Sequence, residues 1–173
     1  MGGYGSGRHG GCGSPKTTVE DCLSLSADAL VRFGLLKPDQ FLRGSLTWTL
    51  ASNGEKTSSI GSETDARWGQ NPTVRLYYTV TRTGESVDYT VRLATTPLPW
   101  GGVRWWFLCP LSKDGCGCGR RVGKLYLPRS GRYFGCRHCY DLIHRSTRTS
   151  HALDSLALAF GLSPAELKKA FAR

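Results

Sequence analysis

Every second residue is apolar in two neighbouring stretches near the middle of the chain. Residues 74–81 and 87–93 both follow this pattern, and Thr83-Gly84 lies between them. A period of two is typical of a half-buried strand, so the pattern predicts an antiparallel hairpin. Residues 103–108 carry apolar or aromatic side chains on both faces. We expect that strand either to be central or to carry the cysteine-rich segment that follows it.

A second hairpin is predicted upstream of the first. Residues 46–50 alternate between apolar and polar positions, and Asn53-Gly54 after them is a strong signal for a two-residue hairpin turn. The chain is expected to return as a strand through residues 56–60. Residues 61–72 are polar and contain Gly and Pro, so they predict a loop.

Segments with helical spacing flank these strands. Ser26 is placed to cap a helix over residues 27–33, which Gly34 would end. Near the C-terminus, residues 150–160 and 163–171 predict two short helices. This pair is similar to a helix-turn-helix, but the second helix has little room to read bases. We therefore expect the pair to pack on the sheet or to bind a partner.

Five of the seven cysteines lie in one stretch of the chain. They are Cys109, Cys116, Cys118, Cys136 and Cys139. A short hairpin is predicted between them, with strands at residues 122–127 and 132–134 and a turn at 128–131. Two cysteine clusters joined by a hairpin are typical of a zinc ribbon with four thiolate ligands.

Cys109, Cys136 and Cys139 are three of the predicted zinc ligands. For the fourth we choose Cys118, because Gly119 after it eases the tight turn that follows a ligand. Cys116 is the reserve ligand. The zinc is expected to be structural. The alternatives are a pair of disulfides, which need an oxidising compartment, or buried free thiols.

These patterns together predict an α+β fold: an antiparallel β-sheet domain, a four-cysteine zinc ribbon and a C-terminal helical pair. We expect a flexible Gly-rich arm (1–16), an N-terminal helix plus antiparallel β domain (17–108), the ribbon (109–140) and the C-terminal helices (141–173). No apolar run is long enough to span a membrane, and no secretory signal is recognisable. The expected location is cytoplasmic, without a membrane partner.

Positive charge is concentrated around the cysteines. The chain has a net charge of +10, and residues 104–148 contain ten basic and two acidic residues, a local net charge of +8. Such a patch on a zinc module favours binding to a phosphate backbone, although a basic surface that only aids solubility is the alternative. The candidate nucleic-acid-binding residues are Arg104, Arg120, Arg121, Lys124, Arg129, Arg132, Arg137, Arg145 and Arg148.

A second candidate surface lies on the predicted strands. Its members are Arg75, Tyr77, Arg82, Arg92 and Trp100. Aromatic and basic side chains of this kind can stack on the bases and contact the phosphates of a single strand. The alternative is that these are ordinary strand exteriors.

Several short motifs resemble a zinc-ribbon family of bacteria, prophages and other mobile elements. They are Trp105-Trp106-Phe107-Leu108-Cys109-Pro110, Cys118-Gly119-Arg120-Arg121, Leu125-Tyr126 and Cys136-Arg137-His138-Cys139, together with the glycine-rich start. The resemblance covers residues 1–150 and supports Cys118 as the second ligand. It implies a phage or mobile-element origin, and it implies no activity.

Three classes of function are compatible with these features. The first is a non-catalytic zinc-ribbon protein that binds nucleic acid, DNA rather than RNA. The second is a protein-interaction module that modulates a host complex, such as an anti-defence factor or a transcription regulator. The third is an enzyme such as a nuclease, for which Asp141 and His144 are the nearest pair. Four thiolates leave zinc no open position for catalysis, so we expect no enzyme activity.

Overall fold

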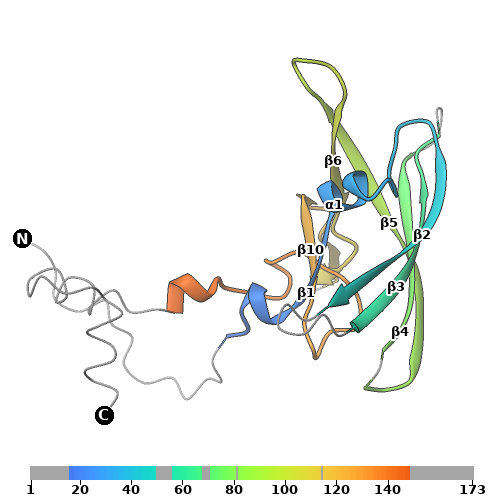
Figure 1. Cartoon of the computed structure of the whole chain (residues 1–173). Helices are drawn as coiled ribbons and strands as arrows, with labels where there is room; N and C mark the ends of the chain where they lie inside the picture. Colours follow the sequence, from blue (N-terminus) through green and yellow to red (C-terminus); the bar gives the residue numbers. More distant parts are fainter. Residues whose placement is uncertain (1–15, 50–55, 68–70, 81, 114, 149–173) are drawn as a thin grey trace, which may run out of the picture.

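Most of the described chain forms β-strands. The computed structural model describes residues 16–49, 56–67, 71–80, 82–113 and 115–148. A curled antiparallel sheet of six strands dominates it (Figure 1). In spatial order these strands are β2 (Phe41–Thr49), β3 (Lys56–Asp65), β4 (Thr73–Val80), β5 (Glu85–Pro97), β6 (Val103–Leu108) and β9 (Arg121–Val122).

The central hairpin forms as its alternation predicts. Val74 pairs with Val91 and Val80 with Glu85, which confirms the β4–β5 hairpin. Gly84 has a φ of +67°, a conformation that glycine adopts without steric cost. The predicted strand 103–108 is also confirmed as β6, and it lies between β5 and β9.

Two strands that lie far apart in sequence form a second, smaller sheet. β1 (Leu23–Ser26) pairs antiparallel with β10 (Lys124–Leu127). The ribbon hairpin predicted between residues 122–127 and 132–134 forms only in part. Tyr126 and Gly135 form an antiparallel bridge with two backbone hydrogen bonds, but residues 132–134 are not a strand. The predicted strand 122–127 is instead divided between β9, which pairs with β6, and β10, which pairs with β1.

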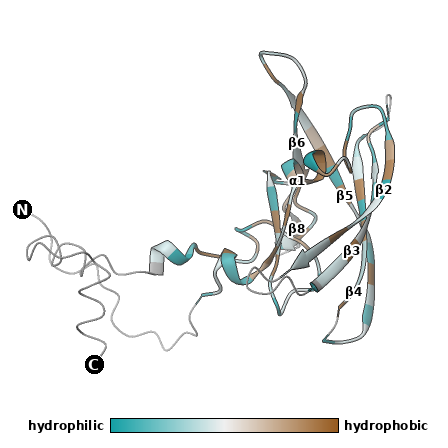
Figure 2. Cartoon of the chain, viewed as in Figure 1, coloured by the Kyte–Doolittle hydropathy of each residue, from teal (hydrophilic) through white to brown (hydrophobic). Residues whose placement is uncertain are grey.

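One hydrophobic core joins both sheets. It includes Leu25 of β1, Leu30 of α1 (Ala27–Arg32), Val74 of β4, Phe107 of β6 and Phe134. Apolar positions alternate with polar ones along β4 and β5 of the six-stranded sheet (Figure 2). The core residues therefore fix the cysteine-bearing segments to the sheet.

The predicted α+β class is wrong for the described residues, which are mostly β. Their helical elements are α1 and two short 3-10 helices, η1 (Val19–Asp21) and η2 (Arg145–Arg148). No C-terminal helical pair is found among them, and the predicted helices at 150–160 and 163–171 lie outside the described residues. The segment before η2 forms backbone hydrogen bonds with the N-terminal segment instead. The Val19 amide donates to the Ile143 carbonyl at 3.0 Å.

The loop predicted at residues 61–72 is wrong in its first part, because β3 continues to Asp65. Ser62 and Thr64 are buried there although both are polar. Their hydroxyls donate to the carbonyls of Gly44 and Leu35, which removes the cost of burying them. The loop was predicted from the polar residues and from the Gly and Pro among them. Hydrogen bonds from buried hydroxyls allow the polar residues of its first part to form a strand instead.

Candidate metal centre and basic surface

Four cysteine sulfurs converge at one point. The ligand atoms of Cys109, Cys118, Cys136 and Cys139 all lie within 4.8 Å of one another. The Sγ atoms of Cys109 and Cys139 are 3.8 Å apart, and those of Cys118 and Cys136 are also 3.8 Å apart. Four sulfurs at about 2.3 Å from a tetrahedral zinc ion would be separated by about 3.8 Å. The four cysteines therefore fit a single metal ion.

Backbone amides point at these sulfurs. The Cys136 amide donates to Cys109 Sγ at 3.2 Å, and the Cys139 amide donates to Cys136 Sγ at 3.4 Å. The amides of Leu111 and Arg120 donate to Cys109 and Cys118 respectively. Hydrogen bonds of this kind stabilise thiolate charge and orient the ligands. The loops are thus arranged for anionic sulfur.

The pKa values show the cost of gathering four thiols without a cation. Burial raises the pKa of Cys109. The pKa of Cys139 is raised by burial and by hydrogen bonds with the neighbouring thiols of Cys118 and Cys136. Burial also opposes ionisation of Cys118, but the pKa of that thiol is lowered by the Arg120 amide and by the surrounding thiols that donate to it. A bound cation would favour the thiolate form at all four positions.

The first pair of cysteines is spaced by a small hairpin that the sequence did not predict. Strands β7 (Ser112–Lys113) and β8 (Cys116–Gly117) pair between Cys109 and Cys118. The Cys118 amide donates to the Leu111 carbonyl at 2.8 Å, which closes the base of the hairpin. Cys116 is exposed on this hairpin and does not belong to the four-sulfur cluster.

A basic and aromatic surface lies beside the cluster, centred on Trp106. The guanidinium carbons of Arg104 and Arg121 lie over the Trp106 ring, at 4.3 and 5.7 Å from its centroid. Lys124 and Arg137 line the same shallow hollow of about 410 Å³. We call the set Arg104, Trp106, Arg121, Lys124 and Arg137 the Trp106 surface.

The Trp106 surface carries unpaired positive charge. None of its four cations forms an ion pair with a carboxylate among the described residues, although Asp28 also lines the hollow. The hollow is also lined by Val122, Gly123, Tyr126, His138 and His144. The four cations were predicted from the sequence as nucleic-acid-binding residues, but Trp106 was predicted only to lie on a face of the strand 103–108. The spacing of two residues between Arg104 and Trp106 could have indicated its role, because it places both side chains on the same face of that strand.

The other predicted nucleic-acid-binding residues are dispersed. Arg120, which follows Gly119 after Cys118, is exposed, and Arg148 is the last residue of η2. Arg132 forms an ion pair with Glu85, and Arg145 contacts Asp21 at 3.4 Å. Arg129 lines a different hollow. The structure therefore gathers four of the nine residues on one surface.

The second candidate surface does not form as a unit. Arg75 is held by Asp88 and Glu63, and the Tyr77 ring covers Gly61 on the neighbouring strand. Trp100 lies at the tip of the β5–β6 hairpin instead of on β4. Arg75 is thus occupied by intramolecular ion pairs.

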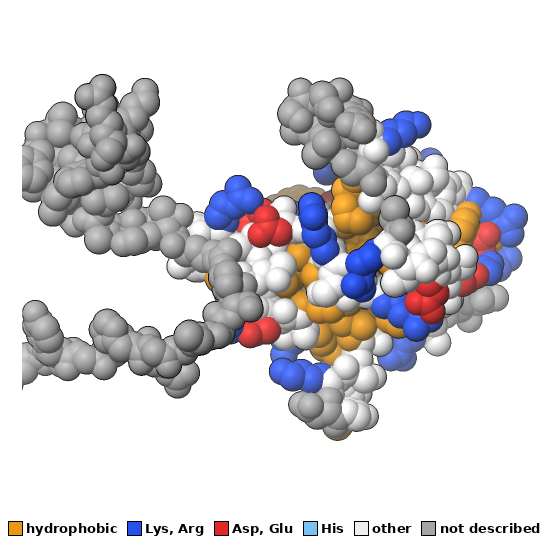
Figure 3. All heavy atoms as spheres, turned by 90° about the horizontal axis from the view of Figure 1, so that it is seen from below, with side chains coloured by type: hydrophobic (Ala, Val, Ile, Leu, Met, Phe, Trp, Pro, Cys, Tyr) orange, Lys and Arg blue, Asp and Glu red, His pale blue; other side chains and the backbone are white. Residues whose placement is uncertain are grey.

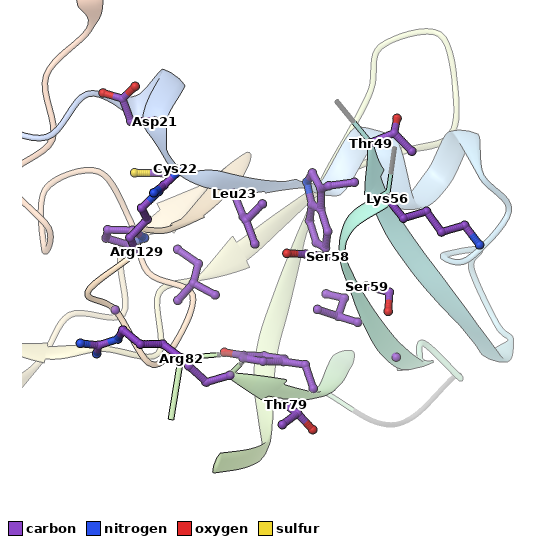
Figure 4. Close-up of a pocket in the computed structure, with 18 of the residues that line it drawn as sticks. Asp21, Cys22, Leu23, Thr49, Lys56, Ser58, Ser59, Thr79, Arg82 and Arg129 are labelled. Carbon is purple, nitrogen blue, oxygen red and sulfur yellow. The ribbon is translucent and has the colours of Figure 1, made fainter. Parts of the chain in front are cut away.

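A larger groove, of about 1180 Å³, lies between β1–β10 and strands β2–β4 (Figure 4). Apolar and aromatic side chains line it, including Trp48, Tyr77 and Tyr78. Arg82 and Arg129 lie on one side and Ser58 and Ser59 on the other (Figure 4). Viewed from below, hydrophobic side chains gather on this face with Lys and Arg around them (Figure 3).

The pair considered for catalysis has other partners. Lys16 forms an ion pair of 2.6 Å with Asp141, and His144 faces Glu20 at 3.7 Å. Side-chain hydrogen bonding from Lys16 lowers the pKa of Asp141. Neither contact indicates a reaction, so the absence of enzyme activity stays a prediction.

Comparison of the chain with models of protein families, with curated proteins and with solved structures finds no match. The resemblance to the prophage zinc-ribbon family therefore stays a prediction. Among the described residues, no helix is long and apolar enough to cross a membrane.

Proposed function

We propose that the protein is a non-catalytic module that binds nucleic acid through the Trp106 surface and holds that surface in place with a structural zinc ion. The observation that carries the proposal is the stacking of Arg104 and Arg121 on Trp106, beside four converging thiols. We further propose DNA as the natural ligand, a cytoplasmic location and an origin in a phage or other mobile element.

Stacking prepares the two guanidinium groups for phosphate binding. A guanidinium held against an indole face keeps its planar donor fork free for phosphate oxygens. Because its position is already restricted, less side-chain entropy is lost on binding. Arg104 and Arg121 have no carboxylate partner among the described residues, so no ion pair has to break first.

The backbone segments that carry the proposed metal ligands also carry two of the cations. The Cys109 amide donates to the Arg120 carbonyl at 2.9 Å, next to Arg121, and Arg137 lies between Cys136 and Cys139. The positions of Arg121 and Arg137 thus depend on loops that the four sulfurs bring together. Zinc suits the site because four thiolates in tetrahedral geometry are its usual structural ligands.

The proposal is tested by binding of a labelled DNA oligonucleotide at several salt concentrations. Replacing Arg104 and Arg121 with Gln is expected to weaken binding and to reduce the slope of log K against log salt by about 1.4 to 1.8. The matched control is the Arg43→Gln, Arg75→Gln double variant. It removes the same charge from residues that are paired with Glu63.

The control variant is expected to bind with a slope close to that of the unmodified protein. Equal loss of affinity in both double variants would mean that net charge, and not the Trp106 surface, determines binding. No salt-dependent binding in the unmodified, zinc-loaded protein would contradict the proposal itself.

The groove favours a second candidate function, the protein-interaction module. Its lining is aromatic and carries both charge signs, from Glu20 and Asp21 as well as from Arg82 and Arg129, which suits a protein surface better than a uniform phosphate chain. A nuclease-treated pull-down separates the two functions. Stable recovery of one protein, lost when Tyr77 is replaced with Asp, would support the second candidate.

A further inference from the structure

Trp100 is the most exposed of the large hydrophobic side chains in the described part of the chain. The residue is 94% exposed, compared with 67% for Phe33 and 44% for Leu98. It lies at the tip of the β5–β6 hairpin, which projects beyond the other strands (Figure 1). Burial of this indole against a partner would remove a large apolar surface from water and so favour binding, which makes the position a candidate contact site.

The tip holds Trp100 in a defined turn. The Gly101 amide donates to the Leu98 carbonyl at 3.1 Å, and the Leu98 amide donates to the Gly102 carbonyl at 3.1 Å. Pro99 fixes the second position of the turn, and Gly101 has a φ of +90°, which permits the chain to reverse. Trp100 is therefore presented on a constrained loop, and little ordering is required before it binds.

The hairpin that carries Trp100 also carries two members of the Trp106 surface, Arg104 and Trp106, on β6. Thr96 of β5 pairs with Arg104 of β6, and the Trp106 indole donates to the Thr96 hydroxyl at 3.0 Å. Arg104 lies four positions after Trp100 in the chain, a span of about 14 Å at most. One strand of nucleic acid has a phosphate about every 3.4 Å, so about four nucleotides would bridge the two side chains.

The charge of the hairpin favours nucleic acid over a protein pocket. From Thr90 to Leu108 the chain contains two arginines, Arg92 and Arg104, and no carboxylate. A strand held by phosphate contacts at Arg104 would meet no acidic side chain of this segment on its way to the tip. Aromatic side chains beside such cations are used to stack on unpaired bases.

We infer that Trp100 stacks on an exposed base of single-stranded DNA while Arg104 and Arg121 hold phosphates about four nucleotides away on the same strand. The inference rests on the proposed function, and it adds a base-contacting residue and a preference for single strands. Because every base has an apolar ring face, the contact would tolerate many sequences.

The test compares two ligands with the same number of phosphates. One is a single strand of about 15 thymidines, and the other is an abasic strand of the same length. Trp100→Ala is expected to weaken binding to the thymidine strand about tenfold, with little change for the abasic strand. Trp100→Phe should restore part of the loss. Phe33→Ala, which removes an exposed aromatic side chain outside the hairpin, should leave both affinities unchanged.

The outcomes separate this inference from the proposed function. If the unmodified protein binds the thymidine strand and Trp100→Ala binds it equally well, the Trp100 inference is wrong and the proposed function stands. An equal loss on both strands would also exclude a base contact. If the unmodified protein binds neither strand nor duplex DNA, both proposals fail. If Trp100→Ala loses a protein partner but binds the thymidine strand with unchanged affinity, Trp100 contacts a protein and not DNA.

Discussion

The Phe134 amide donates a hydrogen bond of 2.8 Å to the phenol oxygen of Tyr89, 45 residues earlier in the chain. This contact joins the segment before Cys136 to strand β5. The Tyr78 hydroxyl on β4 makes a related contact, because it donates to the Arg132 carbonyl at 2.7 Å. The Phe134 ring also stacks against Trp48, with centroids 6.1 Å apart. The second cysteine pair is thus positioned by contacts with the sheet, in addition to the metal ion that we propose.

Replacing Tyr89 with Phe is expected to lower the free energy of unfolding by about 1–3 kcal/mol, because the Phe134 amide would lose its partner in a buried position. Urea denaturation in excess zinc measures the change. The comparison variant is Tyr78→Phe, which leaves the carbonyl of the exposed Arg132 accessible to water and should cost less. A larger loss for Tyr78→Phe would contradict this assignment of the buried contact.

Replacing Gly135 with Ala is expected to destabilise the ribbon by about 1–3 kcal/mol through overpacking. A Cβ atom at Gly135 would lie 2.1 Å from Leu111 Cδ1, which belongs to the first cysteine loop. Thermal unfolding measures the loss. Gly117→Ala is the matched control, because a Cβ atom there meets nothing within 4 Å.

The Leu111→Ala, Gly135→Ala double variant tests the steric cause. Truncating Leu111 removes the closest contact, so Gly135→Ala should cost less in that background than alone. Additive losses would show that the two loops do not touch as described.

Cys118 and Cys116 are predicted to behave differently although only one residue separates them. Cys118→Ser should abolish stoichiometric zinc binding and disorder the ribbon, because one of four converging sulfurs is lost. Cys116→Ser should retain one zinc per chain, since that thiol is exposed outside the cluster. Native mass spectrometry distinguishes the two. Loss of zinc from Cys116→Ser alone would reverse the assignment.

Local patterns in the sequence were sufficient for part of the fold and the site. The alternation in residues 74–80 and the turn at Gly84 predict β4 and β5, because adjacent strands and their turn are encoded together. Gly119 after Cys118 favoured the cysteine that lies in the cluster, and its φ of +55° is consistent with that reasoning.

Non-local pairing could not be predicted in the same way. β1 has four residues, and its partner β10 begins about a hundred residues later in the chain. The local sequence therefore does not distinguish a strand at Leu23–Ser26 from the segment that precedes a helix. Thr64 was assigned to a loop because its hydroxyl is polar, and its acceptor on Leu35 becomes visible only in the structure. The grouping of Arg104 with Arg121 likewise depends on the β6–β9 pairing.

The most direct test of the account measures zinc content and DNA binding in the same sample during chelation. We predict one zinc per chain, and simultaneous loss of zinc and of salt-dependent DNA binding as a strong chelator is added, with recovery of both on adding zinc back. Purified protein without zinc, or DNA binding that persists unchanged after all zinc is removed, would contradict a metal-clamped basic surface.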